Sequence, residues 1–201
     1  GGGSGGVAWR GGGGGGYGRE PAPRATGKGI VSASVPLGAV MTADTMAEPL
    51  LHGKECFNHG LTFGGHPVAC AVGLANIDVI EREDLCGHVR EHEPAFRAML
   101  DGLRDLDIVG DVRGAGYFHA IELVKDKETK ATFDAAESEQ LLRGFLSSEL
   151  YARGLICRTD DRGDPVIQLA PPLIAGPEQF AEIEAILRGV LAEAWRRIPR
   201  G

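Results

Sequence analysis

The carboxy-terminal half of this 201-residue chain alternates between two apolar patterns, and that alternation limits the folds it can adopt. Apolar residues recur at helical spacing over 133–153 and again over 178–198, after Pro177. Short apolar runs with turn residues, typical of strands, lie at 108–124, 155–157 and 166–169. Strands and helices that alternate in this way predict an α/β fold.

The preceding segment predicts further helices around two loops. The sequence indicates strand and turn over 30–41, a short helix over 42–51 and a polar loop over 57–65. Pro67 then opens a helix to about residue 80, because proline fits a first helical position where its missing N–H has no partner. A second helix is expected over 85–106, broken or started afresh near Pro94.

Glycine is the main departure from ordinary composition, with 31 residues concentrated at the start. A segment so rich in glycine buries too little to offset its ordering entropy, so we expect residues 1–20 to be disordered. The chain does not begin with methionine, and we therefore expect it to be a fragment of a longer protein or an incomplete gene product.

The net charge of −7, without a basic run, argues against nucleic-acid binding. Neither a membrane-spanning apolar stretch nor a secretion signal is recognisable. Four cysteines are few for this length, and they indicate reduced thiols in the cytoplasm rather than a disulfide framework.

Lys28 stands between Gly27 and Gly29, on an uncrowded loop before an apolar segment. A lysine that forms a Schiff base needs such a place, because partial burial lowers the pKa of the amine and makes it nucleophilic. The alternative is an ordinary solvated loop lysine.

Thr62 and the glycines after it precede the helix that opens at Pro67. The N–H groups and partial positive charge of a helix start suit a phosphate, although an ordinary loop and cap explain the same residues. The spacings Cys56-x-x-His59 and His66-x-x-x-Cys70 also occur in zinc sites. We expect no metal here, because a cysteine inside an alanine-rich apolar helix usually serves packing, but zinc stays an alternative.

Arg158 is expected to end the apolar strand 155–157, before an aspartate-rich loop. An arginine there could bind a carboxylate through two hydrogen bonds, whereas a surface pairing with the neighbouring aspartates is the plainer interpretation.

The order of these segments resembles the class III aminotransferases, which include omega-transaminases and ornithine- and aminobutyrate-type enzymes. The segments that carry the resemblance, in family order, are Lys28–Val40, His59–Pro67, Val112–Tyr117, and Arg158 followed by Leu169–Leu173. The similarity runs from about Lys28 to the end of the chain.

The resemblance implies a PLP-dependent transferase of fold type I, with Lys28 as the catalytic residue that holds pyridoxal 5'-phosphate covalently. It implies that Thr62 and Phe63 bind the cofactor, with Thr62 contacting the phosphate of the neighbouring subunit, so that the working unit is a homodimer. It also implies that Arg158 binds the carboxylate of an amino or keto acid. The reaction would move an amino group from an amine or amino acid to a keto acid or aldehyde.

The resemblance also implies a domain division: residues 21–83 are the end of the large cofactor-binding domain, and 84–201 form a small α/β domain. The family's aspartate partner of the pyridine nitrogen lies upstream of the lysine, whereas the first aspartate here is Asp44. Ser34 also stands where the family often has an aromatic residue. We therefore expect weak cofactor binding by this chain alone, and the alternative is a catalytically inactive remnant that acts as an interaction domain.

Overall fold

The computed structural model describes residues 24–54, 58–160 and 163–198, and it divides into two compact units after Cys86. The glycine-rich segment 1–20, predicted to be disordered, lies outside the described residues. The domain boundary expected at residues 83–84 stays a prediction.

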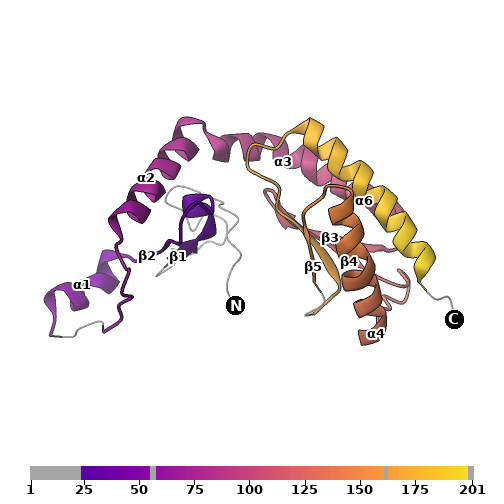
Figure 1. Cartoon of the computed structure of the whole chain (residues 1–201), viewed down its shortest axis with the longest axis horizontal. Coiled ribbons are helices and arrows are strands. Elements are labelled where there is room, and N and C mark those ends of the chain that lie inside the picture. Colours follow the sequence, from indigo (N-terminus) through magenta and orange to yellow (C-terminus); the bar gives the residue numbers. More distant parts are fainter. Residues whose placement is uncertain (1–23, 55–57, 161–162, 199–201) are drawn as a thin grey trace. The chain divides into compact units, whose positions relative to one another are not determined.

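The first unit consists of a short hairpin and two helices. Its elements are β1 (Arg24–Gly27), η1 (Lys28–Val31), β2 (Gly38–Met41), α1 (Asp44–His52) and α2 (Pro67–Arg82) (Figure 1). β1 and β2 pair antiparallel, with Gly27 opposite Gly38. The helices predicted over 42–51 and from Pro67 are confirmed, and Pro67 occupies the first turn of α2 as expected.

A close approach at Gly73 fixes how η1 packs on α2. A Cβ atom at Gly73 would lie 2.9 Å from Leu37 Cδ2 and 3.7 Å from Val31 Cγ1. Val31 is fully buried there, together with Ala69 of the same helix. Only a residue without a side chain lets the segment that begins at Lys28 lie so near the helix.

The second unit is a sheet with helices on one face. Its elements are α3 (Leu85–Gly102), η2 (Leu103–Asp105), β3 (Val109–Ala115), β4 (Phe118–Leu123), α4 (Ala135–Ser138), η3 (Glu139–Leu146), α5 (Ser147–Ala152), β5 (Arg158–Asp160), β6 (Val166–Leu169) and α6 (Pro177–Arg197) (Figure 1). The sheet order is β3-β4-β6-β5, and every pairing is antiparallel. The predicted α/β alternation is confirmed.

Strand alternation separates an apolar face of this sheet from a polar one. Val112, Ile121 and Ile167 stand opposite one another across three strands and are buried against the helices in one core. The adjacent row, Arg113–Ala120–Gln168–Arg158, points to the other face, because successive side chains of a strand alternate. Arg158, which is expected to bind the substrate carboxylate, therefore lies on the polar face of the sheet.

The predicted helix over 133–153 forms as three consecutive segments, α4, η3 and α5, in which η3 is a π-helix. It begins at a capping box: Glu137 N–H donates to Asp134 Oδ1 at 2.9 Å, and Asp134 N–H donates to Glu137 Oε2 at 3.0 Å. The last predicted helix is confirmed as α6, with Pro177 at its start.

The predicted break near Pro94 is wrong. α3 continues through Pro94 to Gly102, although proline removes one backbone hydrogen bond. Pro94 is exposed, and the residues that follow it, Phe96 and Leu100, are fully buried in the core of the second unit. Their packing holds the helix together where the local preference alone would interrupt it.

The strand predicted over 155–157 is also wrong, since the strand β5 begins at Arg158 rather than ending there. In the observed register Arg158 pairs with Gln168, so Leu155 would stand opposite Pro171. Proline has no N–H to donate to the ladder, and Pro172 follows it. Pairing therefore stops at the end of β6, and Ile156 is left 82% exposed.

Candidate functional site

Lys28 is the first residue of η1 and follows directly after the end of β1 at Gly27. Its backbone is left-handed, with φ of 53°, and its side chain is exposed. Such a φ is uncommon for a residue with a side chain, and strained positions of this kind concentrate at functional sites. Contacts with neighbouring residues must therefore stabilise the left-handed backbone of Lys28.

Asn76 of α2 holds that turn. Its Nδ2 donates to the carbonyl oxygens of Gly29 at 3.0 Å and Ile30 at 3.1 Å, and Ser32 Oγ donates to Asn76 Oδ1 at 2.7 Å. Three hydrogen bonds of the Asn76 side chain therefore hold the backbone that follows Lys28. Asn76 is not among the residues predicted from the sequence, although an amide within an apolar helical stripe was a signal for it.

Thr62 and Phe63 lie on a tight turn directly before α2. Gly64 N–H donates to the Leu61 carbonyl at 2.8 Å, and His66 N–H donates to the Phe63 carbonyl at 3.2 Å. Gly65 has φ of 73°, which glycine adopts without strain. Both predicted cofactor residues are exposed, Phe63 by 81%. Since Asn76 belongs to the same helix, α2 is common to the Lys28 turn and the Thr62 turn.

Arg158 lies on β5, the edge strand of the second unit. Its Nη2 is 3.1 Å from Asp160 Oδ2, and Gln168 Nε2 donates to the same oxygen at 3.4 Å. The predicted surface pairing of Arg158 with an aspartate is thus present. Arg158 belongs to the second unit and Lys28 to the first.

The segment Val112–Tyr117 places Arg113 on the same polar face as Arg158. Arg113 contacts Glu122 of β4 and lies 3.5 Å from Asp164. The hydrogen bond to Glu122 holds the pKa of the Arg113 guanidinium above its ordinary value. Arg113 is therefore a permanent cation engaged with carboxylates.

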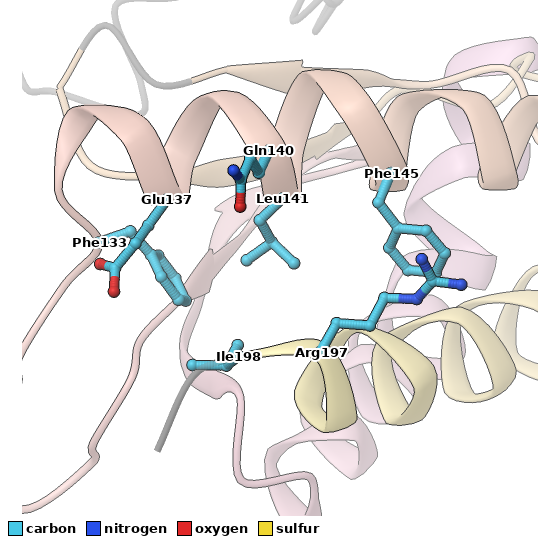
Figure 2. Close-up of a pocket in the computed structure, with 7 residues that line it drawn as sticks. All are labelled: Phe133, Glu137, Gln140, Leu141, Phe145, Arg197 and Ile198. Carbon is cyan, nitrogen blue, oxygen red and sulfur yellow. The ribbon is translucent and has the colours of Figure 1, made fainter. Parts of the chain in front are cut away.

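The second unit contains a cavity of about 170 Å³ (Figure 2). It is lined by Phe133 before α4, by residues of α4 and η3, by Arg197 at the end of α6 and by Ile198 after it. The Arg197 guanidinium lies 4.0 Å from the centre of the Phe145 ring. Neither Arg158 nor any other predicted site residue lines it.

Over the described ranges, no group of three or more histidine, cysteine, aspartate or glutamate side chains could hold a metal ion. Cys56, a member of the alternative zinc pattern, lies outside the described residues. None of the described helices is both long enough and apolar enough to cross a membrane.

Comparison with known proteins identifies one family. The model of the family described as "Aminotransferase class-III" matches residues 16–191. The chain is 56% identical to "Probable aminotransferase Rv3329" of Mycobacterium tuberculosis over 170 residues, 85% of this chain and 36% of that protein. It is 36% identical to the putrescine–pyruvate aminotransferase of Pseudomonas aeruginosa, across 87% of this chain and 37% of the other.

Solved structures show the same relation. An aminotransferase of Vibrio fluvialis in its PMP-bound form has a TM-score of 0.82 at 30% identity, covering 91% of this chain and 40% of that one. An (S)-enantioselective omega-transaminase of Thermomicrobium roseum has a TM-score of 0.80 at 34% identity, covering 89% and 38%. The chain spans less than half the length of these relatives.

Proposed function

Because the chain belongs to the class III aminotransferase family, we propose that it is the lysine-bearing part of a pyridoxal-phosphate-dependent aminotransferase. The family match over residues 16–191 carries this proposal, since it includes every segment that singled out Lys28, Thr62, Phe63 and Arg158. The proposed reaction moves an amino group from an amine or amino acid to a keto acid or aldehyde.

Lys28 is the proposed catalytic residue. Its exposed side chain on a left-handed turn leaves Nζ accessible to a carbonyl group. When bound, pyridoxal 5'-phosphate supplies an electron sink for the carbon that loses a proton. Lys28 is the residue that would hold the cofactor covalently, and its free amine would serve as the group that takes and returns the proton. Asn76 keeps the lysine in place by holding the next two carbonyls.

The turn with Thr62 and Phe63 is the proposed phosphate-binding segment. A hydroxyl and free backbone N–H groups at a helix start are suited to a phosphate. Both side chains are exposed in the single chain, which favours a site completed by a second subunit. We therefore propose a homodimer in which Thr62 contacts the cofactor phosphate of the neighbouring subunit.

Arg158 is the proposed residue for the substrate carboxylate, through charge-assisted hydrogen bonds. The relative from Pseudomonas aeruginosa is named for putrescine and pyruvate, a diamine and a keto acid. We propose the same classes here, small amines or amino acids as donors and keto acids or aldehydes as acceptors, in a cytoplasmic enzyme.

Titration of the purified chain with pyridoxal phosphate tests the role of Lys28. Covalent attachment to a lysine produces an absorbance band at the violet edge of the visible spectrum, which we expect for the wild type and not for Lys28→Ala. Lys54→Ala is the matched control, because Lys54 is also an exposed loop lysine of the first unit. Persistence of the band in Lys28→Ala, at wild-type strength, would refute the proposal.

A second candidate function, a catalytically inactive interaction domain, is favoured by one observation. Large apolar side chains of the first unit stand in solvent, among them Leu51, Leu61, Phe63 and Leu74. Apolar surface of this kind marks contact sites. Analytical ultracentrifugation of the chain without cofactor tests for such an interface, since a monodisperse monomer at high concentration would argue against it. Because the proposed aminotransferase is also a dimer, the Lys28-dependent absorbance band is what separates the two candidates.

A further inference from the structure

The cavity in the second unit lies against η3, the π-helix that follows α4 (Figure 2). π-helices are rare and are often found at functional sites. Their backbone hydrogen bonds join residues five positions apart, so Gln140 and Phe145 lie on successive turns of one side. An α-helix would separate these two side chains by roughly 140° around its axis. The π-helical winding therefore directs both residues to the cavity, which they line together with Leu141.

The cavity has the size and the lining for one aromatic ring. Phe133 and Leu141 belong to the buried core of the second unit, and Phe145 and Ile198 pack against that core. All four side chains line the cavity, whose volume is about 170 Å³. An apolar cavity of about 150 Å³ accepts benzene. Phenylalanine rings add favourable edge-to-face or offset contacts with a bound ring.

Arg197 places a cation at the edge of this apolar space. Its guanidinium lies 4.0 Å from the centre of the Phe145 ring, and its Nη2 donates to Glu193 Oε1 at 2.6 Å. Glu193 is shared with Arg153, whose Nη2 lies 3.2 Å from Oε2. A guanidinium carries several N–H donors, and the side chain of Arg197 is 55% exposed. Arg197 can therefore donate to a ligand while Glu193 holds it in position.

The carboxylate that lines the other end of the cavity is already bound. Glu137 Oε1 accepts from Lys125 Nζ at 2.6 Å, and Oε2 accepts from Asp134 N–H at 3.0 Å. Figure 2 shows Glu137 and Arg197 at opposite ends of the apolar lining. Lys125 balances the charge of Glu137, whereas Arg196 adds a second cation to the last turn of α6. These charges favour an anionic ligand group at the Arg197 end of the cavity.

We propose that this cavity binds a small aromatic monocarboxylate, a single ring that carries one carboxylate. The ring would lie among Phe133, Leu141 and Phe145, and the carboxylate would accept charge-assisted hydrogen bonds from Arg197. The site uses none of the residues proposed for transamination, so it is a second binding site of the chain. The ligand would contact both η3 and the end of α6, and its binding would hold these two segments together.

Amide-detected NMR titration of the full chain with benzoate tests the proposal. Benzamide is the uncharged counterpart with the same ring, and acetate is the carboxylate without a ring. We expect benzoate to shift the amide signals of Gln140, Leu141 and Phe145, because these residues line the cavity. Benzoate should bind about two- to tenfold more tightly than either control ligand, since only benzoate contacts both the apolar lining and Arg197.

Two variants of neighbouring arginines separate a specific contact from general attraction. Arg197→Gln should weaken benzoate binding about two- to tenfold and leave the affinity for benzamide unchanged. Arg196→Gln is the matched control, because it removes the same charge from the same turn at a residue that does not line the cavity. Ile198→Trp fills the cavity from a partly buried position and should abolish the shifts caused by both benzoate and benzamide.

Several results would overturn the proposal. Equal weakening by Arg196→Gln and Arg197→Gln would mean that benzoate responds to net charge alone, and equal affinities for benzoate and benzamide would mean that the carboxylate is not recognised. Shifts of Thr159 and Asp160 instead of Gln140 and Leu141, lost in Arg158→Ala, would place benzoate at the arginine proposed for the substrate. That last result would support the proposed function while refuting the second site.

Discussion

Between residues 24 and 86, the apolar side chains that the described structure buries are those of Val31 and Ala69, whereas the unit from Gly87 onward encloses a core cluster of 23 buried residues. Burial of apolar area is the main favourable term in folding. The second unit therefore has its own source of stability. The first unit has a hairpin and a polar network at Asn76, and it carries the proposed catalytic lysine.

We expect the largest change in stability from a substitution in the core of the second unit. Leu187 is fully buried in α6, so Leu187→Ala should lower the free energy of unfolding by about 2–5 kcal/mol through lost transfer energy and a residual cavity. Urea denaturation measures this. Ile156→Ala is the control, because that exposed side chain should change stability by less than about 0.5 kcal/mol. Equal effects of the two substitutions would mean that the second unit lacks the core described.

The free energy of unfolding of the second unit should also depend on pH. His119 is buried beside the Phe96 ring; Nε2 bonds to the Gly116 carbonyl at 3.0 Å, and Nδ1 has no hydrogen-bond partner among the described residues. Burial holds the pKa of His119 below its ordinary value of about 6.5. The unfolded chain then binds more protons below that value, so the stability contribution is complete above about pH 6.5 and is lost as the pH falls.

The free energy of unfolding should therefore fall below pH 6.5 by at most about 1.4 kcal/mol per pH unit from this residue. Denaturation of the wild type and His119→Leu between about pH 5 and 7.5 measures the difference. The carboxylates whose pKa is lowered, such as Asp101 beside Arg97, lose their contribution only at lower pH. An unchanged slope in His119→Leu would contradict the assignment.

In the first unit, we test the hydrogen bonds of Asn76. Asn76→Ala removes two hydrogen bonds to backbone carbonyls and one from Ser32, at a cost of about 1–2 kcal/mol in local opening. Hydrogen exchange at the amides of Ser32, Ala33 and Ser34, which close the turn after Lys28, measures the loss. Leu74→Ala, at an exposed position of the same helix, should leave those amides unchanged. Faster exchange in both variants would show that α2 as a whole, not Asn76, protects the turn.

The smallest effect should come from surface ion pairs of the second unit. Arg188 Nη1 donates to both Asp105 oxygens, at 2.8 and 2.9 Å, but the pair is partly exposed. Asp105→Asn should lower the free energy of unfolding by about 0.2–1 kcal/mol, less in high salt. Urea denaturation at two salt concentrations measures it. A loss as large as that of Leu187→Ala would overturn the view that the core dominates.

The sequence predicted these regions with different success for physical reasons. Helical periodicity identified α6, which buries one stripe of residues, and it also identified α2, of which only Ala69 and Gly73 are buried. The continuous α3 and the start of β5 at Arg158 were missed, since tertiary packing around Pro94 and the lack of an N–H at Pro171 decide them. Of the site, Lys28, Thr62, Phe63 and Arg158 came from family motifs, and their roles remain proposals. Asn76, Asp160 and Gln168 came only from the structure, because long-range contacts and strand register bring them to their partners.

One measurement tests the central claim, that Lys28 is the cofactor lysine, most directly. The full chain is incubated with pyridoxal phosphate, reduced with borohydride to fix any covalent adduct, digested and mapped by mass spectrometry. We expect the label to concentrate on the peptide with Lys28 at low cofactor concentration, ahead of the exposed Lys54 and Lys127. Label spread evenly over the surface lysines, with Lys28 not preferred, would contradict it.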